Sequence, residues 1–354
     1  MKRTQTALIT GAALAGAGAI CAGATAVVLY RGVSNLMSRR LLGKVVLITG
    51  GSRGLGLAMA EEFGRRGARL VLTARDPNEL ERARMLLIRR RVVRDDSDVL
   101  VIPADLRDVS QVEQMVQRAT SSFGEIDILV NNAGIITVGP VENQTAQDFH
   151  EVMDANFFTG LHCSLAILPQ MLRRRSGTIV NIASIGGKIA VPHLLPYTAS
   201  KFAAVGFSQG LNAELRSKGI HVVTVCPGLM RTGSHLQAQF TGNAAREYRW
   251  FSFSANLPGA STSAAAAARK IVRAVLLKES EIAITPQAIF ASRSASLAPE
   301  VVAQAMSLAN RLLPSAADEQ CEPRPGSHFR NAEVKPIAST IGSAAARRYN
   351  QTAM

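Results

Sequence analysis

The sequence predicts an α/β protein with a doubly wound, parallel sheet of seven strands and helices on both faces. From Gly43 onward, short β-branched runs alternate with amphipathic stretches, and the runs are predominantly apolar. Such strands, separated by helices, are typical of a parallel sheet covered on both faces. The predicted strands are 45–49, 69–73, 99–103, 126–130, 178–182, 221–226 and 281–285, with amphipathic segments such as 57–66 and 109–123 between them.

Composition and charge exclude several classes of protein. The 354 residues are 47% hydrophobic and 19% charged, as in a globular protein. The net charge of +14 comes from short basic clusters (39–40, 89–91 and 173–175) without interleaved aromatic residues, so we expect no nucleic-acid partner. Anionic lipid or a phosphorylated cofactor explains the charge as well. Cys21, Cys163, Cys226 and Cys321 lack metal-ligand spacing, which favours reduced thiols and no metal site.

Residues 1–40 form an apolar segment with basic flanks. The run 7–30 carries no charge and is long enough to cross a hydrocarbon core of about 30 Å as a helix. We therefore predict a hydrophobic N-terminal helix that anchors the protein in a membrane by a single pass, with the catalytic domain on the cytoplasmic side. Small residues at 22–26 resemble a cleavage site, so a signal peptide remains an alternative, as does a soluble leader.

The rest of the chain divides into one large domain and a C-terminal extension. Residues 41–286 hold all seven predicted strands and form the nucleotide-binding, catalytic domain. Residues 287–313 are Ala-rich and predict a helical extension interrupted at Pro299. Residues 314–354 are polar and contain three further prolines within 323–336, which predicts a loosely ordered tail.

A glycine-rich turn follows the first predicted strand and opens the next helix. Phosphate oxygens need bare backbone amides at a helix N-terminus, which glycine allows and larger side chains block. The turn therefore predicts a dinucleotide site, although a tight turn that needs only glycine is the simpler alternative. The predicted cofactor residues of this turn are Gly50, Ser52, Arg53, Gly54, Leu55 and Gly56.

The end of the second predicted strand indicates which dinucleotide binds. An NAD site usually places an acidic residue there for the ribose hydroxyls, but this chain has Ala74 followed by Arg75. Arg75 and Arg53 can hold a 2′-phosphate, which favours NADP. Asp76 is near enough to keep NAD open as an alternative, and either arginine could be a solvated surface charge.

Polar and small residues also follow the third and fourth predicted strands. Carboxyl ends of strands are where ligands bind in an open α/β sheet, although these residue types also suit ordinary turns. The residues that we assign to the cofactor site there are Asp105, Leu106, Asn132, Ala133 and Gly134. Asp105 is placed to accept the adenine amino group.

Ser184, Tyr197 and Lys201 predict a site for acid/base chemistry. Ser184 ends the fifth strand, Tyr197 follows Pro196 at a helix start, and Lys201 lies one turn further on the same face. An adjacent ammonium lowers the pKa of a phenol, so Tyr197 can exchange a proton with a carbonyl or alcohol while hydride moves at the neighbouring carbon. Lys201 also holds the cofactor ribose, and Ser184 hydrogen-bonds the substrate oxygen.

Together these motifs resemble the short-chain dehydrogenase/reductase family over residues 44–286. Its glycine turn matches 49–56, its Asn-Asn-Ala-Gly matches 131–134, and its catalytic Ser, Tyr and Lys match the three residues above. The resemblance implies a Rossmann-type fold and oxidoreductase activity. It also makes Asn156 the anchor of a proton-relay water, and it implies a homodimer or homotetramer formed through helices in 151–172 and 202–218. In the loop against the nicotinamide it points to Pro227, Gly228, Met230 and Thr232.

The predicted substrate lid, residues 230–264, carries an aromatic cluster. Its members are Phe240, Tyr248, Trp250, Phe251 and Phe253. On a loop near a membrane they fit a lipophilic substrate such as a 3-oxoacyl lipid, a steroid or a retinoid-like aldehyde, while ordinary core or dimer contacts are the alternative. A non-catalytic dinucleotide-binding scaffold, or an epimerase or dehydratase on the same fold, remains the alternative to an oxidoreductase.

Overall fold

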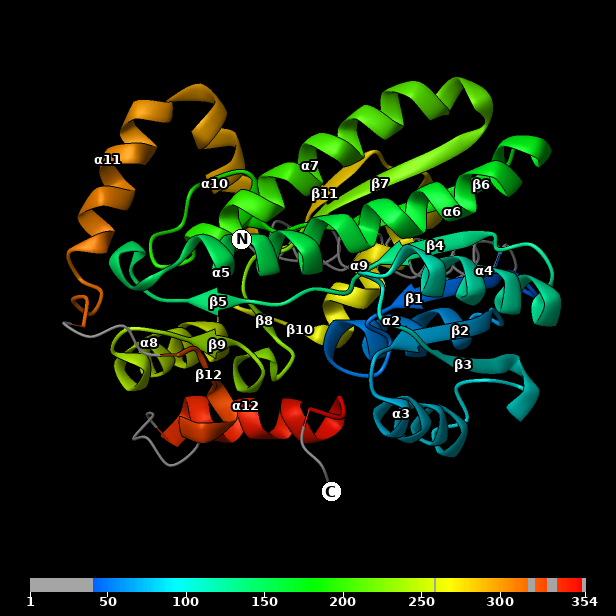
Figure 1. The fold of residues 1–354 in the computed structure, drawn as a ribbon, viewed down its shortest axis with the longest axis horizontal. Coiled ribbons are helices and arrows are strands. Elements are labelled where there is room, and N and C mark those ends of the chain that lie inside the picture. Colours follow the sequence, from blue (N-terminus) through cyan, green and yellow to red (C-terminus); the bar gives the residue numbers. More distant parts are fainter. Residues whose placement is uncertain (1–40, 258, 318–321, 330–335, 352–354) are drawn as a thin grey trace, which may run out of the picture. The chain divides into compact units, whose positions relative to one another are not determined.

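The computed structural model describes residues 41–257, 259–317, 322–329 and 336–351, and it confirms the predicted parallel sheet of seven strands (Figure 1). Residues 43–354 form one unit and residues 1–42 another, of which only Leu41 and Leu42 are described. The strands lie in the order β11-β7-β6-β4-β1-β2-β3. Their bounds are β1 Val45–Thr49, β2 Arg69–Ala74, β3 Val99–Pro103, β4 Ile128–Asn131, β6 Gly177–Ile182, β7 Ile220–Cys226 and β11 Glu281–Ala283.

The order of the strands reverses between β1 and β4, and this reversal indicates where a ligand site lies. The chain runs from β1 through β2 to β3 on one side, and then through β4, β6 and β7 to β11 on the other. All these pairs are parallel, with Thr49 opposite Thr73 and Asn131 opposite Asn181. Ligands bind at such a reversal, beyond the carboxyl ends of the strands.

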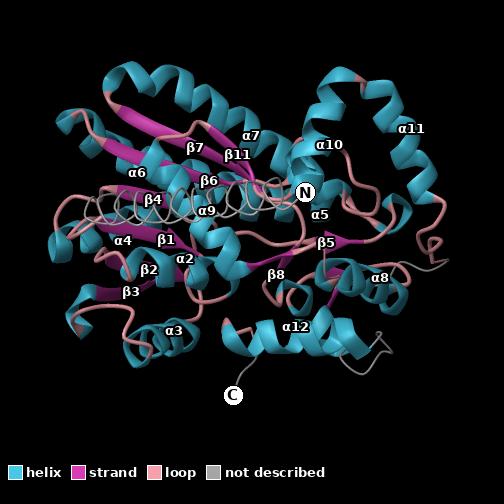
Figure 2. Ribbon diagram, turned by 180° about the vertical axis from the view of Figure 1, so that it is seen from behind, coloured by secondary structure: helices cyan, strands magenta, loops and turns pink. Residues whose placement is uncertain are grey.

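Helices cover both faces of the sheet. The face toward the viewer in Figure 1 carries α4, α6 and α7, whereas α2 and α9 lie on the opposite face, which Figure 2 shows. Val112 and Met115 of α4, and Cys163 and Ile167 of α6, share one buried core with the strands. The helix bounds are α2 Gly54–Gly64, α3 Pro77–Arg89, α4 Val109–Phe123, α5 Ala146–Met153, α6 Thr159–Arg174, α7 Leu195–Leu215, α8 Ala244–Asn256 and α9 Ala264–Leu277.

The predicted lid segment folds into short strands around helix α8. One small sheet joins β5 (Thr137–Val138), β9 (Gln239–Phe240) and β12 (Arg324–Pro325), and a second pairs β8 (Met230–Arg231) with β10 (Thr262–Ser263). Within 230–264, β8 and β10 pair with each other, whereas β9 joins this segment to β5 and to β12 outside it.

The C-terminal residues are more regular than their polar composition indicates. After β11 the chain forms α10 (Pro286–Leu297) and α11 (Pro299–Asn310), which meet at Pro299. The expectation of a loosely ordered tail differs from the structure, which has a helix, α12 (Pro336–Arg348), packed against α8 (Figures 1 and 2). Composition misses this helix because its packing partner is distant in the sequence.

The predicted N-terminal anchor, residues 1–40, lies outside the described residues. Among the helices that are described, none is both long and apolar enough to cross a membrane.

Candidate active site

The glycine turn between β1 and α2 leaves backbone amides at a helix N-terminus. Gly50 and Gly54 have φ of +61° and +59°, a region that side chains disfavour. A Cβ on Gly56 would overlap the carbonyl oxygen of Gly50, so this position also requires glycine. The amides of Leu55 and Gly56 have no acceptor among the described residues. They are suited to bind an anion, which fits the phosphates of a dinucleotide.

Thr49 and Asn132 hold this turn against the end of β4. The Thr49 hydroxyl accepts hydrogen bonds from the amides of Asn132 (2.9 Å) and Ala133 (3.0 Å). The side-chain amide of Asn132 donates to the carbonyl oxygens of Thr49 (2.9 Å) and Gly50 (3.2 Å). The predicted residues Asn132 and Ala133 therefore lie beside the glycine turn, and Thr49 explains how the two segments are joined.

The two arginines that we predicted at the 2′-phosphate have different environments. Arg53 forms an ion pair with Glu79 (2.6 Å), which also accepts a hydrogen bond from the Ser52 hydroxyl (3.1 Å). Arg75 is exposed and has no hydrogen-bonded or ion-paired partner in the described part of the chain. Asp76 caps helix α3 by accepting from the amides of Asn78 (2.8 Å) and Glu79 (3.2 Å). The Asp76 carboxylate is thus bound to the first turn of α3. Of the two arginines, Arg75 is more accessible than Arg53.

Asp105 and Leu106 follow β3 as expected, but each of them contacts other residues of the protein. Asp105 accepts hydrogen bonds from the guanidinium Nε of Arg107 (3.0 Å), and this bonding holds its pKa below the usual value. Leu106 is buried in the core beneath α4 and α6. In the structure, Asp105 therefore holds Arg107 and Leu106 contributes to the core.

Ser184, Tyr197 and Lys201 come together at the ends of β6 and the start of α7. The Lys201 ammonium lies 5.6 Å from the centre of the Tyr197 ring and donates to the carbonyl oxygen of Ile182 (3.0 Å). Ser184 accepts from the amide of Gly186 (3.0 Å) and is hydrogen-bonded to the phenol of Tyr197. The helix begins here because Pro196 is favourable in its first turn.

Burial is the largest cause of the pKa shifts of Tyr197 and Lys201. It raises the pKa of Tyr197 above its ordinary value, while the hydrogen bond with Ser184 acts in the opposite direction. Burial also lowers the pKa of Lys201 to about 8. The pKa of Tyr197 thus lies above its ordinary value, and not below it as expected from the adjacent ammonium, because the loss of solvation exceeds the effect of the Ser184 hydrogen bond.

Asn156 interrupts a helix beside the predicted catalytic residues. It lies in a π-helical turn, Asp154–Phe158, between α5 and α6. Its side chain accepts from the amide of Ile135 (2.7 Å) and donates to the carbonyl oxygen of Ile135 (3.1 Å) and the hydroxyl of Ser200 (2.9 Å). A Cβ on Gly134 would stand 2.7 Å from the Asn156 oxygen, so glycine there permits this approach.

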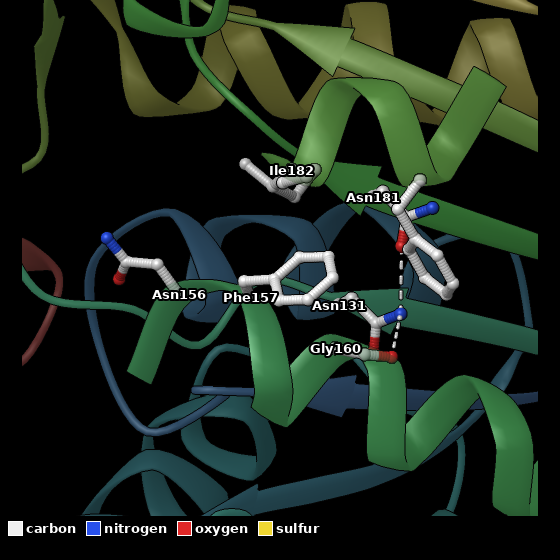
Figure 3. A pocket seen from close by; sticks show the side chains of 8 residues that line it. Asn131, Asn156, Phe157, Gly160, Asn181 and Ile182 are labelled. Atoms are coloured by element: carbon white, nitrogen blue, oxygen red, sulfur yellow. Dashed lines mark hydrogen bonds between the residues drawn. The ribbon is translucent and has the colours of Figure 1, made fainter. Parts of the chain in front are cut away.

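A small cavity of about 20 Å³ lies next to Asn156 (Figure 3). Asn131 and Asn181 also line it, and the Asn131 amide donates to Asn181 (2.9 Å) and to the carbonyl oxygen of Gly160 (3.2 Å). The Asn131 side-chain oxygen is buried and has no hydrogen-bond partner. A polar cavity of this size can hold a water molecule.

The loop after β7 contacts both the segment that follows β6 and the glycine turn. The carbonyl oxygen of Pro227 accepts from the amide of Ile185 (2.8 Å), and a Cβ on Gly228 would overlap the hydroxyl of Thr285. Met230 is half-buried in β8. Thr232 lies 3.9 Å from the position of a Cβ on Gly54, so the two ends of the predicted cofactor site approach each other.

The lid aromatics pack into a core against which the phenol of Tyr197 also packs. Phe240, Tyr248 and Phe251 are buried together, and Trp250 and Tyr197 pack against them half-buried. This favours the core alternative for the three buried rings. The surface beside Tyr197 is nevertheless apolar, since Val191 and Leu194 belong to the same cluster.

Several residues of the site were not predicted from the sequence. They are Thr49, Glu79, and the C-terminal Tyr349, Asn350 and Gln351, which lie against the glycine turn. A threonine at the end of a strand could have indicated the first. The C-terminal residues give no local signal, since a polar tail has no periodicity that shows what it contacts.

Comparisons with known proteins agree with this geometry. The profile of a family described as short chain dehydrogenase matches residues 44–241. A dehydrogenase/reductase SDR family protein 7-like of Anopheles gambiae is 37% identical over 249 residues, 70% of this chain and 77% of the relative. Ketoacyl reductase HetN of a Nostoc species is 35% identical over 188 residues, 53% of this chain and 64% of the relative.

Solved structures show the same fold. A short-chain dehydrogenase from Streptomyces avermitilis has a TM-score of 0.64 and 27% identity, and covers 76% of this chain and 97% of its own. Levodione reductase has a TM-score of 0.59 and 28% identity over 70% of this chain and 98% of its own. The protein is an oxidoreductase whose family binds NAD or NADP and small-molecule substrates. By its sequence profile and its relatives, the chain belongs to the short-chain dehydrogenase/reductase family.

Proposed function

We propose that the protein is an NADP(H)-dependent oxidoreductase that interconverts a carbonyl and a secondary alcohol on a lipophilic substrate. The observation that carries the proposal is the grouping of Ser184, Tyr197 and Lys201 at the strand reversal, beside a glycine turn with unpartnered amides. When bound there, the nicotinamide supplies or accepts the hydride. The protein supplies the proton and holds both reactants.

Tyr197 is the general acid/base in this proposal. Its raised pKa keeps the phenol protonated near neutral pH, so it is ready to give a proton to a carbonyl oxygen. Ser184, hydrogen-bonded to the same phenol, holds the substrate oxygen where negative charge develops. Lys201 stabilises the resulting phenolate and holds the ribose. Asn156, beside the small cavity, positions a water for return of the proton.

The remaining predicted residues hold the dinucleotide. The amides of Leu55 and Gly56 bind phosphate, and the exposed Arg75 binds the 2′-phosphate that distinguishes NADP from NAD. The capping role of Asp76 supports this choice, because a carboxylate committed to helix α3 is less suited to ribose hydroxyls. Pro227, Gly228, Met230 and Thr232 lie against the nicotinamide.

The apolar surroundings of Tyr197 support a lipophilic substrate. Val191, Leu194 and the half-buried Trp250 belong to the apolar cluster against which the phenol packs. Two similar proteins are named reductases, a ketoacyl reductase and levodione reductase, which supports the reductive direction. A 3-oxoacyl lipid, a steroid and a retinoid-like aldehyde are the first compounds to examine.

We also propose that residues 1–40 anchor the protein in a membrane with the catalytic domain on the cytoplasmic side. The uncharged run 7–30 between basic residues supports this. Membrane fractionation and the mass of the mature protein test it. Loss of the first two dozen residues, or full recovery of the protein in the soluble fraction, would contradict it.

A substrate panel with native protein and Tyr197→Phe tests the activity. We expect native protein to oxidise NADPH with at least one lipophilic ketone or aldehyde, and Tyr197→Phe to lose about 10²–10⁴-fold in kcat because it has no proton to give. NADPH binding, followed by its fluorescence, should persist in the variant. Equal turnover by both proteins would contradict the role of Tyr197, and a scaffold would show no turnover by either.

A further inference from the structure

The last described residues of the chain bind the glycine turn directly. Helix α12 ends at Arg348, and the carbonyl oxygen of Tyr349 then accepts a hydrogen bond from the amide of Gly54 (2.9 Å). The side-chain amide of Asn350 donates to the carbonyl oxygens of Ser52 (2.9 Å) and Glu79 (3.1 Å). Asn350 is only 6% exposed and has a φ of +56°. Residues 349–351, which we call the strap, are thus built into the turn.

The strap also contacts the lid segment. The carbonyl oxygen of Gln351 accepts from the side-chain amide of Gln237 (3.3 Å). A Cβ on Gly233 would stand 2.7 Å from the Cα of Ala346 and 3.0 Å from the Cγ of Gln351, so the backbones approach closely there. The strap therefore joins the glycine turn to the lid, next to the point where Thr232 approaches Gly54.

Gln351 presents an unsatisfied amide at this point. Its Nε2 atom lies 2.9 Å from the position that a Cβ on Gly54 would take. Its Oε1 atom is buried and has no hydrogen-bond partner, although the residue is only 7% exposed. Burying an amide oxygen without a partner is unfavourable, and such groups in folded proteins commonly meet a ligand or water.

The strap bonds to only one of the backbone amides at the start of α2. It takes the amide of Gly54, whereas the amides of Leu55 and Gly56 have no acceptor among the described residues. An anion can therefore bind the N-terminus of α2 while the strap stays in place, with the amide of Gln351 beside it.

We propose that Gln351 is a dinucleotide-binding residue and that the strap remains closed over the bound cofactor. The inference rests on the proposed function, because it concerns the same cofactor site. An amide can donate to a phosphate oxygen and accept from a ribose hydroxyl, so Gln351 suits the pyrophosphate and its adjoining sugars. The strap carries it there from the C-terminus and fixes it between the turn and the lid.

Binding of NADPH to full-length Gln351 variants tests the contact. We expect Gln351→Ala to raise the dissociation constant at least fivefold. Gln351→Glu should raise it further, because a carboxylate beside phosphate repels it, and added salt should reduce the difference between the two variants. Gln304→Ala and Gln304→Glu make the same changes on exposed α11, far from the turn in Figure 1, and should bind NADPH as native protein does.

Equal or tighter binding by both Gln351 variants would overturn the proposal, and the melting temperature without cofactor shows whether each variant is folded. Hydrogen exchange of residues 349–351 provides a second readout. Exchange should slow when NADPH binds, since the closed strap is stabilised. Faster exchange would overturn the proposal by showing that the strap competes with the cofactor. If native protein binds neither NADPH nor NADH, the proposed function itself is wrong. If native protein binds NADPH and both Gln351 variants bind it equally well, only the role of Gln351 is wrong.

Discussion

The pKa values of Tyr197 and Lys201 are shifted in opposite directions by the same physical cause. Burial disfavours charge, so it raises the pKa of the phenol and lowers that of the ammonium to about 8. Lys201 is 5% exposed, and its hydrogen bond to the carbonyl oxygen of Ile182 does not offset the loss of water. Near pH 7 both groups are protonated, which is the state required to donate a proton to a carbonyl.

The pH dependence of carbonyl reduction should therefore follow Lys201. Its ammonium is charged below about pH 8 and loses its charge as the pH rises through that value. We expect kcat/KM for reduction to fall above about pH 8, because neutral Lys201 no longer stabilises the phenolate. Initial rates between pH 6 and 10 measure this. A rate that is constant from pH 7 to 9 would contradict the assignment.

Arg75 should decide between NADPH and NADH. A hydrogen bond to a charged group contributes about 1.5–3 kcal/mol, so Arg75→Ala should raise the KM for NADPH by about 10–100-fold and leave that for NADH nearly unchanged. Arg89→Ala removes a similar exposed charge at the other end of α3 and serves as the control. An equal effect on both cofactors would argue against a 2′-phosphate contact.

At the level of elements, a buried polar cluster attaches α8 to the loop before α7. Glu247 of α8 is fully buried, and its carboxylate contacts the ring of His193 (2.9 Å) and accepts from the indole of Trp250 (2.6 Å). His193 lies four residues before Tyr197. The cluster therefore links α8, in the predicted lid, to the start of α7, which carries Tyr197 and Lys201.

Glu247→Ala should destabilise the protein strongly. It leaves the buried His193 ring and the half-buried Trp250 indole without their partner, at a cost of about 1–3 kcal/mol for each fully buried group. The free energy of unfolding should fall by about 2–5 kcal/mol, as followed by chemical denaturation. Glu113→Ala, on the exposed face of α4, should have little effect. An unchanged unfolding midpoint for Glu247→Ala would show that the cluster does not hold the lid.

At the level of the whole molecule, α6 and α7 present apolar side chains on one covered face of the sheet. Leu165 is 54% exposed and Phe202 is 45% exposed. Phe157 packs on Phe207 with ring centres 5.8 Å apart, which brings the two helical segments side by side. These helices overlap the segments 151–172 and 202–218 that the family resemblance predicts as the oligomer interface.

We propose that this face forms the contact between two copies of the chain. Leu165→Glu and Phe202→Glu should shift the native dimer or tetramer to a smaller species in light scattering, because a buried carboxylate in an apolar interface is unfavourable. Leu308→Glu changes a leucine on α11 that is at least as exposed as these two residues, and it should not alter the mass. The same mass for all these variants would place the interface elsewhere.

Most of the fold could be predicted because its signals are local. Each strand of the main sheet is a predominantly apolar run, and each of its boundaries lies within two residues of the prediction. The glycine turn and the pair Tyr197 and Lys201 likewise depend on positions close in sequence. The helix α12 could not be predicted, because its contact with α8 joins segments that are far apart in the chain.

The sequence by itself determined the parallel sheet, the glycine turn and the residues of the acid/base site, since these depend on apolar runs, backbone freedom and helical spacing. Only the tertiary structure decided how those residues titrate and what adjoins them. Burial is a property of the assembled fold, so the raised pKa of Tyr197 could not be obtained from its neighbours in sequence. The position of Gln351 beside Gly54 follows from packing across the whole domain, which no local pattern encodes.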